Sequence, residues 1–346
     1  MRQLDATLAT LAAENPSTAI GALLRLNGEV VWEGAVGIAN RKTGAALERG
    51  ARIPIYSLTK TFTAVVALSL ARENHLAVAD PVSRWFPELP LPETMTIAHL
   101  LRHTSGLKDY FSLPEYHQDV LNHPQRPWSE KHFLEAILPQ GLLFEPGEGW
   151  AYSNIGYLLL RQIIERLTNA PYSEAVARFI AQPLGLKNTF VAREISDWAT
   201  CIPGYGREVS STNEAIDIRH SYHPGWCAPG VAVSTLSDVT FFYDRLLEGK
   251  ILNQEELALM CSLTRVPWDH PPAVEPSCGM GLLGDPGNPL GASFGHGGGG
   301  PGYSIWASTL KRPVGRLSFM VFANTSEARS DLMQDALLRA ACDELP

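Results

Sequence analysis

A serine and a lysine three positions apart form the first candidate reactive group of this sequence. They are Ser57 and Lys60, in the segment IPIYSLTKTFTAVVALSLAREN. The apolar residues after Lys60 recur at helical spacing, and residues three apart on a helix share a face, so the Lys60 amine can reach the Ser57 hydroxyl. Burial lowers a lysine pKa, and a neutral amine can then take the serine proton. The same pattern would arise from an ordinary helix cap followed by a solvated lysine.

Two other serines also stand in nucleophile-like patterns. Ser105 begins a second S-x-x-K motif, but Gly106 falls in its would-be first turn and DYFSLPEY follows, which predicts a loop. Ser293 lies in GASFG, which matches the G-x-S-x-G elbow of α/β-hydrolases. That elbow needs a strand-to-helix turn and then an acid and a histidine downstream. A glycine run follows Ser293, and the last histidine, His296, comes with no acid between, so we prefer Ser57.

A tyrosine and an asparagine form the second candidate group. Tyr152 and Asn154 lie in FEPGEGWAYSNIGYLLL, where the apolar run after them predicts a helix. A tyrosine near a lysine can lose its proton below its usual pKa of about 10, and can serve as a base and then as an acid. Asn154 could donate to a substrate carbonyl and also hold Lys60. The alternative is a core aromatic residue beside a helix-capping asparagine.

A histidine followed by glycines forms the third group. His296 opens the run HGGGG, directly before a predicted strand, GYSIWAST. Glycines allow an edge strand to approach a substrate closely, so we expect Gly298 and Gly299 to line it. The backbone N–H of Gly299, with that of Ser57, could form an oxyanion hole, and His296 would project into the cleft as a donor. A flexible glycine loop is the alternative reading.

The elements that must position these residues come from both ends of the chain. Asn27-Gly28 predicts a hairpin turn between apolar runs within residues 18–38. Two strands are predicted near the end, over 302–309 and 316–324, and amphipathic helices near residue 8 and over 327–342. Between them the sequence is helical and rich in proline; one of its helices should be capped by Ser173 and end at Pro183.

These elements predict a mixed α/β (α+β) fold. An antiparallel sheet is flanked by N- and C-terminal helices, and a mostly helical lobe is inserted in the middle of the chain. We expect residues 1–78 and 226–346 to form the sheet lobe and 79–225 the helical lobe, with the active site between them. The length of 346 residues, above the usual size of a single core, agrees with two fused lobes.

The three groups occur in the order S-x-x-K, Y-x-N, H-x-G, and here the chain resembles the penicillin-binding-protein and serine β-lactamase superfamily. It looks closest to the branch of class C β-lactamases, D-alanyl-D-alanine carboxypeptidases, D-aminopeptidases and β-lactamase-like esterases. Three further segments carry the resemblance, which extends from about residue 15 to 340: LLRHTSGL at 100–107, FEPGEGWAYSNIGY at 144–157 and APGVAVSTLSDVTFF at 228–242.

The resemblance implies an acyl-enzyme on Ser57, which water then hydrolyses. Lys60 and Tyr152 would share the general-base and general-acid work, either taking the first proton, and Asn154 would orient the substrate. His296 stands where many relatives carry the lysine of K-T-G, and a histidine is neutral much of the time at pH 7, which weakens the case for carboxylate-bearing β-lactams. We therefore expect a carboxylesterase for small esters, with weak β-lactam hydrolysis as a side activity.

Two alternatives to the carboxylesterase stay open. One is a D-amino-acid-specific peptidase or amidase, similar to a D-aminopeptidase or a DD-carboxypeptidase. The other is a penicillin-binding protein that acylates slowly. The partner in each case is a small ester, amide or β-lactam. Aromatic residues near the expected cleft would form an apolar acyl pocket or belong to the core: Tyr110, Phe111, Trp226 and Tyr303.

Composition excludes other classes of protein. The formal charge is −8, from 28 Lys and Arg against 36 Asp and Glu, and no basic stripe indicates nucleic-acid binding. No run of about 18 apolar residues predicts a membrane helix, and the N-terminal residues lack an export signal, so we expect a cytoplasmic protein without a membrane partner. His99 with His103, and His220 with His223, lack further ligands, so no metal and no cofactor is expected.

Overall fold

The computed structural model describes residues 1–267 and 272–345 of the chain. Its largest element is an eight-stranded sheet in which all neighbouring strands are antiparallel. In spatial order its strands are β10 (Thr264–Arg265), β11 (Ser277–Cys278), β12 (Leu283–Asp285), β13 (Ala292–Gly300), β14 (Tyr303–Arg312), β15 (Gly315–Ala323), β1 (Ile20–Leu26) and β2 (Glu29–Val36).

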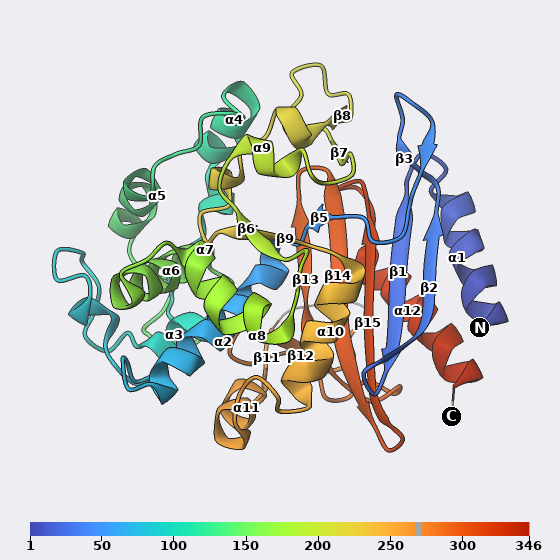
Figure 1. The fold of residues 1–346 in the computed structure, drawn as a ribbon. Helices are drawn as coiled ribbons and strands as arrows, with labels where there is room; N and C mark the ends of the chain where they lie inside the picture. Colours follow the sequence, from blue (N-terminus) through green and yellow to red (C-terminus); the bar gives the residue numbers. More distant parts are fainter. Residues whose placement is uncertain (268–271, 346) are drawn as a thin grey trace.

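Helices cover both faces of this sheet (Figure 1). Helices α1 (Arg2–Glu14) and α12 (Ser330–Glu344) lie side by side on one face, and α10 (Leu236–Leu247) packs on the other. Strand β15 is therefore buried on both sides: Phe319 and Val321 belong to the core under α1 and α12, whereas Met320 and Phe322 belong to the core that includes α10. A strand covered twice reads as a continuous apolar run, as RLSFMVFAN does.

The N-terminal hairpin forms where the sequence predicts it. Asn27 and Gly28 join β1 to β2, and both have positive φ, at 47° and 93°. Two-residue hairpin turns that match the twist of the strands require this conformation, and asparagine and glycine adopt it at little cost.

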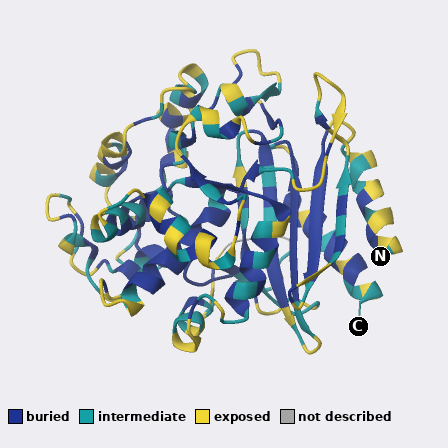
Figure 2. Cartoon of the chain, in the orientation of Figure 1, coloured by how far each residue is buried: buried dark blue, intermediate teal, exposed yellow. Residues whose placement is uncertain are grey.

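The chain between β2 and β12 holds, besides α10, most of the helices of the molecule (Figure 1). Its α-helices are α2 (Thr59–Arg72), α3 (Ile97–Leu101), α4 (Pro114–Asn122), α5 (Glu130–Ile137), α6 (Asn154–Thr168), α7 (Tyr172–Val176), α8 (Gln182–Leu184), α9 (Ile195–Trp198) and α11 (Gln254–Met260). Short 3-10 turns are Tyr56–Leu58, Val82–Arg84, Tyr110–Ser112, Leu138–Gln140, Ile218–His220 and Pro224–Trp226. Helices α2 and α6 are the most deeply buried of the group (Figure 2).

Small sheets join the large elements. Strands β5 (Ile53–Pro54), β9 (Val231–Ser234) and β6 (Phe190–Ala192) form one, in the order β5-β9-β6. Strands β3 (Ile38–Asn40) and β4 (Ala45–Ala46) form a second, and β7 (Tyr205–Gly206) and β8 (Ile216–Asp217) a third. The architecture is the predicted mixed one, an antiparallel sheet with helices. In the part of the chain that is described, no helix combines the length and the apolar character that crossing a membrane requires.

The expected helix over residues 173–182 has different ends. Helix α7 begins at Tyr172, and the Tyr172 N–H donates to Glu165 Oε1 of α6 at 2.9 Å, so a residue from another helix replaces the predicted Ser173 cap. A π-helical stretch, Ala177–Ala181, leads into α8 (Gln182–Leu184), which contains Pro183 and is capped by Gly185 with φ 65°. The widened turn accommodates the proline that was expected to end the helix.

Candidate active site

Ser57 lies in a 3-10 turn, Tyr56–Leu58, directly before α2. Its neighbour Tyr56 has φ 43°, a conformation that costs energy for a bulky residue. The end of β13 holds Tyr56 in place. Its hydroxyl donates to the Pro301 carbonyl at 2.5 Å, and its ring fills the space where a Cβ on Gly300 would stand, 2.4 Å away. Contacts of Tyr56 with Gly300 and Pro301 therefore hold the turn in place. The Ser57 side chain remains partly exposed.

Lys60 lies in the first turn of α2 and is almost fully buried, at 3% exposure. Its Nζ donates to Ser57 Oγ at 3.1 Å and to Asn154 Oδ1 at 2.7 Å. Burial lowers the pKa of Lys60 to about 8, and the negative charge of Asp109 opposes that shift. The solvated-lysine alternative is therefore wrong, and a neutral amine beside Ser57 is accessible near neutral pH.

Tyr152 lies in the loop before α6. Its hydroxyl is hydrogen-bonded to Ser57, and Lys60 Nζ lies 4.9 Å from the centroid of its ring. Burial raises the pKa of Tyr152, and the hydrogen bond to Ser57 only partly opposes this shift. The phenol therefore keeps its proton at neutral pH and is placed to donate it.

Asn154 is the first residue of α6, and the cap of that helix is Ser153, whose Oγ accepts from the Gly156 N–H at 3.2 Å. This frees the Asn154 side chain for Lys60. The Asn154 backbone N–H donates to Asp109 Oδ2 at 2.5 Å. The helix-cap alternative for Asn154 is therefore wrong: Ser153 is the cap, and the Asn154 side chain binds Lys60.

Strand β13 brings the glycine run to the turn that carries Ser57. It pairs with β12 only as far as Gly295, so from His296 onward the described strand has no partner on that side. A Cβ on Gly298 would lie 2.5 Å from the Ile55 carbonyl oxygen, just before the Ser57 turn. Gly299 is exposed, and a Cβ there would have no atom within 4 Å. The run is an ordered strand edge, and not a flexible loop.

His296 is buried in this edge, at 2% exposure, with its ring centroid 6.3 Å from that of Tyr152. Its Nδ1 lies 2.6 Å from the Gly297 carbonyl oxygen, which makes Nδ1 the protonated nitrogen. Burial, and next the charge of Lys60, lower the pKa of His296 to about 3. The imidazole is therefore neutral, where the resemblance places a lysine in many relatives.

Two residues that the motifs did not single out lie against the site. His103 Nδ1 accepts the Ser153 N–H at 3.1 Å, and its ring stacks on Tyr152 at a centroid distance of 4.3 Å. Asp109 binds Asn154, as described above. The segment HTSGLKD contains both, but their partners lie 45 to 50 positions further on, so no local spacing indicated them. His99, in contrast, accepts the Thr96 N–H in the capping box of α3.

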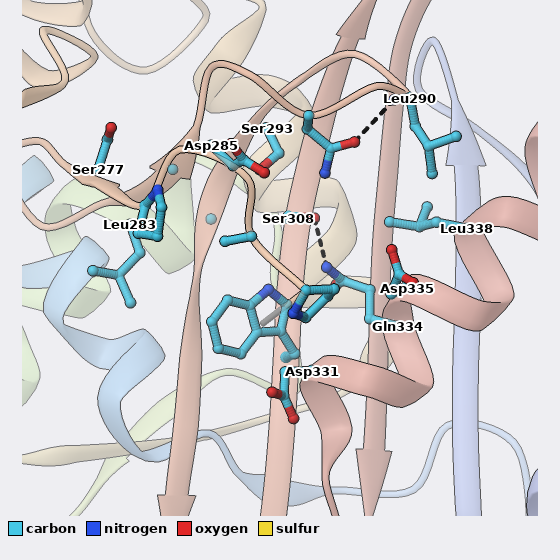
Figure 3. A pocket seen from close by; sticks show the side chains of 17 residues that line it. Ser277, Leu283, Asp285, Leu290, Ser293, Ser308, Asp331, Gln334, Asp335 and Leu338 are labelled. Atoms are coloured by element: carbon cyan, nitrogen blue, oxygen red, sulfur yellow. Dashed lines mark hydrogen bonds between the residues drawn. The ribbon is translucent and has the colours of Figure 1, made fainter. Parts of the chain in front are cut away.

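The competing serines lie elsewhere. Ser105 Oγ accepts the Leu107 N–H at 3.3 Å, and Lys108 donates to the Gln140 carbonyl, so this S-x-x-K forms the predicted loop. Ser293 lies inside β13, which has no strand-to-helix turn at that point. It lines a cavity of about 70 Å³ between the sheet and α12 (Figure 3). Because side chains alternate along a strand, that cavity lies on the face opposite His296.

The aromatic residues near the cleft divide into core and surface. Tyr110, Trp226 and Tyr303 are at most 1% exposed and belong to the main core cluster, which favours the second of the two expected alternatives. Phe111 is 50% exposed, two positions after Asp109. It is the one of the four that could touch a substrate.

Comparisons with known proteins agree with this arrangement. The sequence profile of the β-lactamase family matches residues 4–343. A penicillin-binding protein of Bacillus subtilis (strain 168) is 28% identical over 334 residues, which cover 91% of this chain and 69% of the relative. Esterase EstB of Burkholderia gladioli is 32% identical over 209 residues, 56% of this chain and 52% of the esterase.

Solved structures extend the likeness over nearly the whole chain. D-amino acid amidase from Ochrobactrum anthropi SV3, complexed with L-phenylalanine amide, superposes with a TM-score of 0.86 at 25% identity, covering 99% of this chain and 98% of the amidase. A D-stereospecific amidohydrolase from Streptomyces sp. gives 0.81 at 28% identity, covering 97% of both chains. With the family profile matched along almost its full length, this chain belongs to the β-lactamase family of serine hydrolases.

Proposed function

We propose that this protein is a serine hydrolase that forms an acyl-enzyme on Ser57, and that its substrates are small carboxylic esters. The observation that carries the proposal is the contact of 3.1 Å between Lys60 Nζ and Ser57 Oγ, made by an amine whose pKa burial lowers to about 8. The proposed site lies between a sheet lobe of residues 1–78 and 226–346 and a helical lobe of residues 79–225.

In the proposed acylation, neutral Lys60 takes the proton of Ser57 as Oγ attacks the substrate carbonyl carbon. The backbone N–H groups of Ser57 and Gly299 donate to the developing oxyanion. Tyr152 donates its phenolic proton to the leaving alkoxide, and Lys60 returns a proton to Tyr152 through Ser57 or water. The choice of Lys60 as first base follows from the opposite pKa shifts of the two groups: lowered for the amine, raised for the phenol.

Deacylation repeats these steps with water in place of the alcohol. Lys60 takes the proton of the attacking water, the acyl bond to Ser57 Oγ breaks, and the proton returns to Oγ. Asn154 holds Lys60 through the bond of 2.7 Å, and in the proposal its amide also faces the substrate. Gly298 and His296 line the other wall.

Preference for esters is supported by the charge of the cleft and by one relative. Neutral His296 offers no fixed cation for the carboxylate of a β-lactam or of a C-terminal D-alanine. The partial match to esterase EstB points the same way. The second candidate, hydrolysis of D-amino acid amides, is favoured by the TM-score of 0.86 with the Ochrobactrum amidase, and slow acylation by a β-lactam by the penicillin-binding relative.

The decisive test compares Ser57→Ala with Ser293→Ala. With p-nitrophenyl acetate, Ser57→Ala should lose on the order of 10⁴-fold or more in kcat, whereas Ser293→Ala should stay within a factor of two. A fluorophosphonate probe should label the wild type and Ser293→Ala, but not Ser57→Ala. Activity that is lost only in Ser293→Ala would overturn the assignment of the nucleophile.

A substrate panel separates the three activities. Purified enzyme is assayed with p-nitrophenyl esters, D-aminoacyl amides and nitrocefin at equal concentrations. The proposal expects the largest kcat/KM for an ester. A larger value for a D-aminoacyl amide would favour the amidase, and a burst of nitrocefin cleavage without turnover would favour the slowly acylating protein.

A further inference from the structure

The carboxylate of Asp109 is built into the wall of the candidate site without a role in the proposed reaction. It lies between the loop after α3 and the 3-10 turn Tyr110–Ser112, and it is partly buried. Both oxygens accept backbone N–H groups: Oδ1 from Phe111 at 2.9 Å and Oδ2 from Asn154 at 2.5 Å. The carboxylate thus ties this loop to the first residue of α6.

Asp109 also fixes the orientation of the Asn154 amide. The Asn154 side chain is hydrogen-bonded to Asp109, while its Oδ1 accepts from Lys60 at 2.7 Å. A carboxylate can only accept, and an ammonium or amine N–H donates, so the amide nitrogen faces Asp109 and the oxygen faces Lys60. Reversal of the amide would lose both bonds. A continuous chain of hydrogen bonds therefore runs from Asp109 through Asn154 and Lys60 to Ser57.

The surroundings of Lys60 show why a carboxylate matters there. Besides Asp109, the titratable side chains that interact with Lys60 are Tyr152 and Tyr157, whose rings lie 4.9 and 5.5 Å from Nζ, and His103, Cys227 and His296, through their charges. Burial lowers the pKa of both histidines and raises the pKa of the two phenols and of the thiol, so these five groups are uncharged at neutral pH. Within residues 1–267 and 272–345, Asp109 is the one carboxylate whose charge raises the pKa of Lys60, against the larger effect of burial.

We propose that Asp109 is a positioning residue and the counter-charge of the general base: it orients Asn154 toward Lys60 and balances the ammonium that forms when Lys60 takes the Ser57 proton. This inference rests on the proposed function and goes beyond it. The charge of Asp109 acts on Lys60, Tyr110, Tyr116 and Tyr152, and of these groups only Lys60 can carry a positive charge.

The sign of the effect on pH dependence follows from the charge. Acylation needs neutral Lys60, so its rate falls on the acid side as Lys60 becomes protonated. Asp109 stabilises the protonated form, and removing its charge should lower the pKa of Lys60 further. In a plot of acylation rate against pH, the acid limb, where the rate falls as Lys60 becomes protonated, should then move to lower pH. The plateau rate at higher pH should also fall, because Asn154 is held less firmly. A merely structural role would lower the plateau and leave the limb where it was.

The test measures the rate of Ser57 labelling by a fluorophosphonate as a function of pH, for the full chain and its variants. In Asp109→Asn the acid limb should move down by about one pH unit. Asp109→Glu, which keeps the charge, should return the limb to the wild-type position with a lower plateau. The matched control is Asp119→Asn, since Asp119 accepts from Trp128 Nε1 at 2.8 Å and makes no contact with Lys60; its limb should not move.

Each outcome decides. A wild type that takes no label at Ser57 overturns the proposed function, and the inference with it. A labelled wild type with an Asp109→Asn limb that is unmoved, or moved to higher pH, overturns the inference alone. If Asp109→Asn does not fold, Asp109→Ser, which also removes the charge, takes its place: a limb moved to lower pH supports the inference, and an unmoved limb contradicts it.

Discussion

At the scale of single residues, the environment of His296 distinguishes a histidine that acts as a catalytic base from one that positions the substrate. His296 is neutral, and its Nδ1 proton is used on the Gly297 carbonyl, so Nε2 is left as an acceptor. A triad histidine would need a carboxylate behind Nδ1, where this one has a main-chain oxygen. The imidazole therefore suits substrate positioning, which agrees with the proposal that Lys60 and Tyr152 transfer the protons.

We predict that His296→Ala lowers kcat/KM for a neutral p-nitrophenyl ester by about 10–10³-fold, less than Ser57→Ala does. His296→Lys should raise the ratio of kcat/KM for a carboxylate-bearing substrate to that for the neutral ester, by about tenfold or more, because it restores a fixed cation. Steady-state kinetics with both substrates checks this. If both variants were as inactive as Ser57→Ala on every substrate, His296 would be the base.

Residues whose partners are close in sequence could be predicted, and those with distant partners could not. Ser57 and Lys60 lie three positions apart, and Tyr152 and Asn154 lie two positions apart at the start of α6. The spacing within each pair therefore indicated it. Asp109 reaches Asn154 across 45 positions, and His103 reaches Ser153 across 50. Only the packing of α6 against the loop after α3 brings these together, and no periodicity of the sequence records that contact.

At the scale of elements, the candidate site depends on how closely β13 approaches the turn Tyr56–Leu58, which carries Ser57. A Cβ added to Gly298 would lie 2.5 Å from the Ile55 carbonyl oxygen and 2.9 Å from Leu58 Cδ1. The Ile55 carbonyl belongs to the backbone, so it can move away only if the strand or the turn shifts. Gly299, its neighbour, points an added Cβ into open space. The two glycines therefore make a matched pair, one needed for packing and one not.

We predict that Gly298→Ala displaces the edge of β13 from Ser57 and lowers kcat for a small ester by about 10²-fold or more, since small misplacements of reacting groups are costly. Gly299→Ala keeps its backbone N–H and should lose less than about tenfold, more for bulky esters than for acetate. Kinetics of both variants, with circular dichroism to verify folding, checks this. Equal losses in the two variants would contradict the proposed role of the Gly298 approach.

The elements themselves were predictable where a local signal defined them. The dipeptide Asn27-Gly28 predicts the hairpin turn. The helical spacing of apolar residues after Ser57 predicts the helix. The order of strands does not follow from a local signal, because β1 pairs with β15, whose residues lie nearly the whole chain away. The start of α7 was also missed, since Glu165 of another helix caps it and Ser173 does not.

For the whole molecule, Asn324 is the point where distant segments are joined. It follows β15 and is fully buried. Its Oδ1 accepts the Ala19 N–H at 2.7 Å, and its Nδ2 donates to the carbonyls of Ala39 and Pro203 at 3.2 and 3.0 Å. One amide therefore connects the N-terminal strands, the C-terminal strand and the loop before β7.

We predict that Asn324→Ala lowers the stability of the protein by about 2–4 kcal/mol, because it leaves one N–H and two carbonyls buried without their partner. Asn324→Asp should be worse, since it places a second oxygen against those two carbonyls. Asn122→Ala is the control: Asn122 is exposed at the end of α4, and its loss should stay within about 0.5 kcal/mol. Denaturant midpoints of the three variants measure the order. An Asn324→Ala midpoint equal to that of Asn122→Ala would show that the sheet closes between the two ends of the chain without this amide, and that the apolar pairing of β1 with β15 is sufficient.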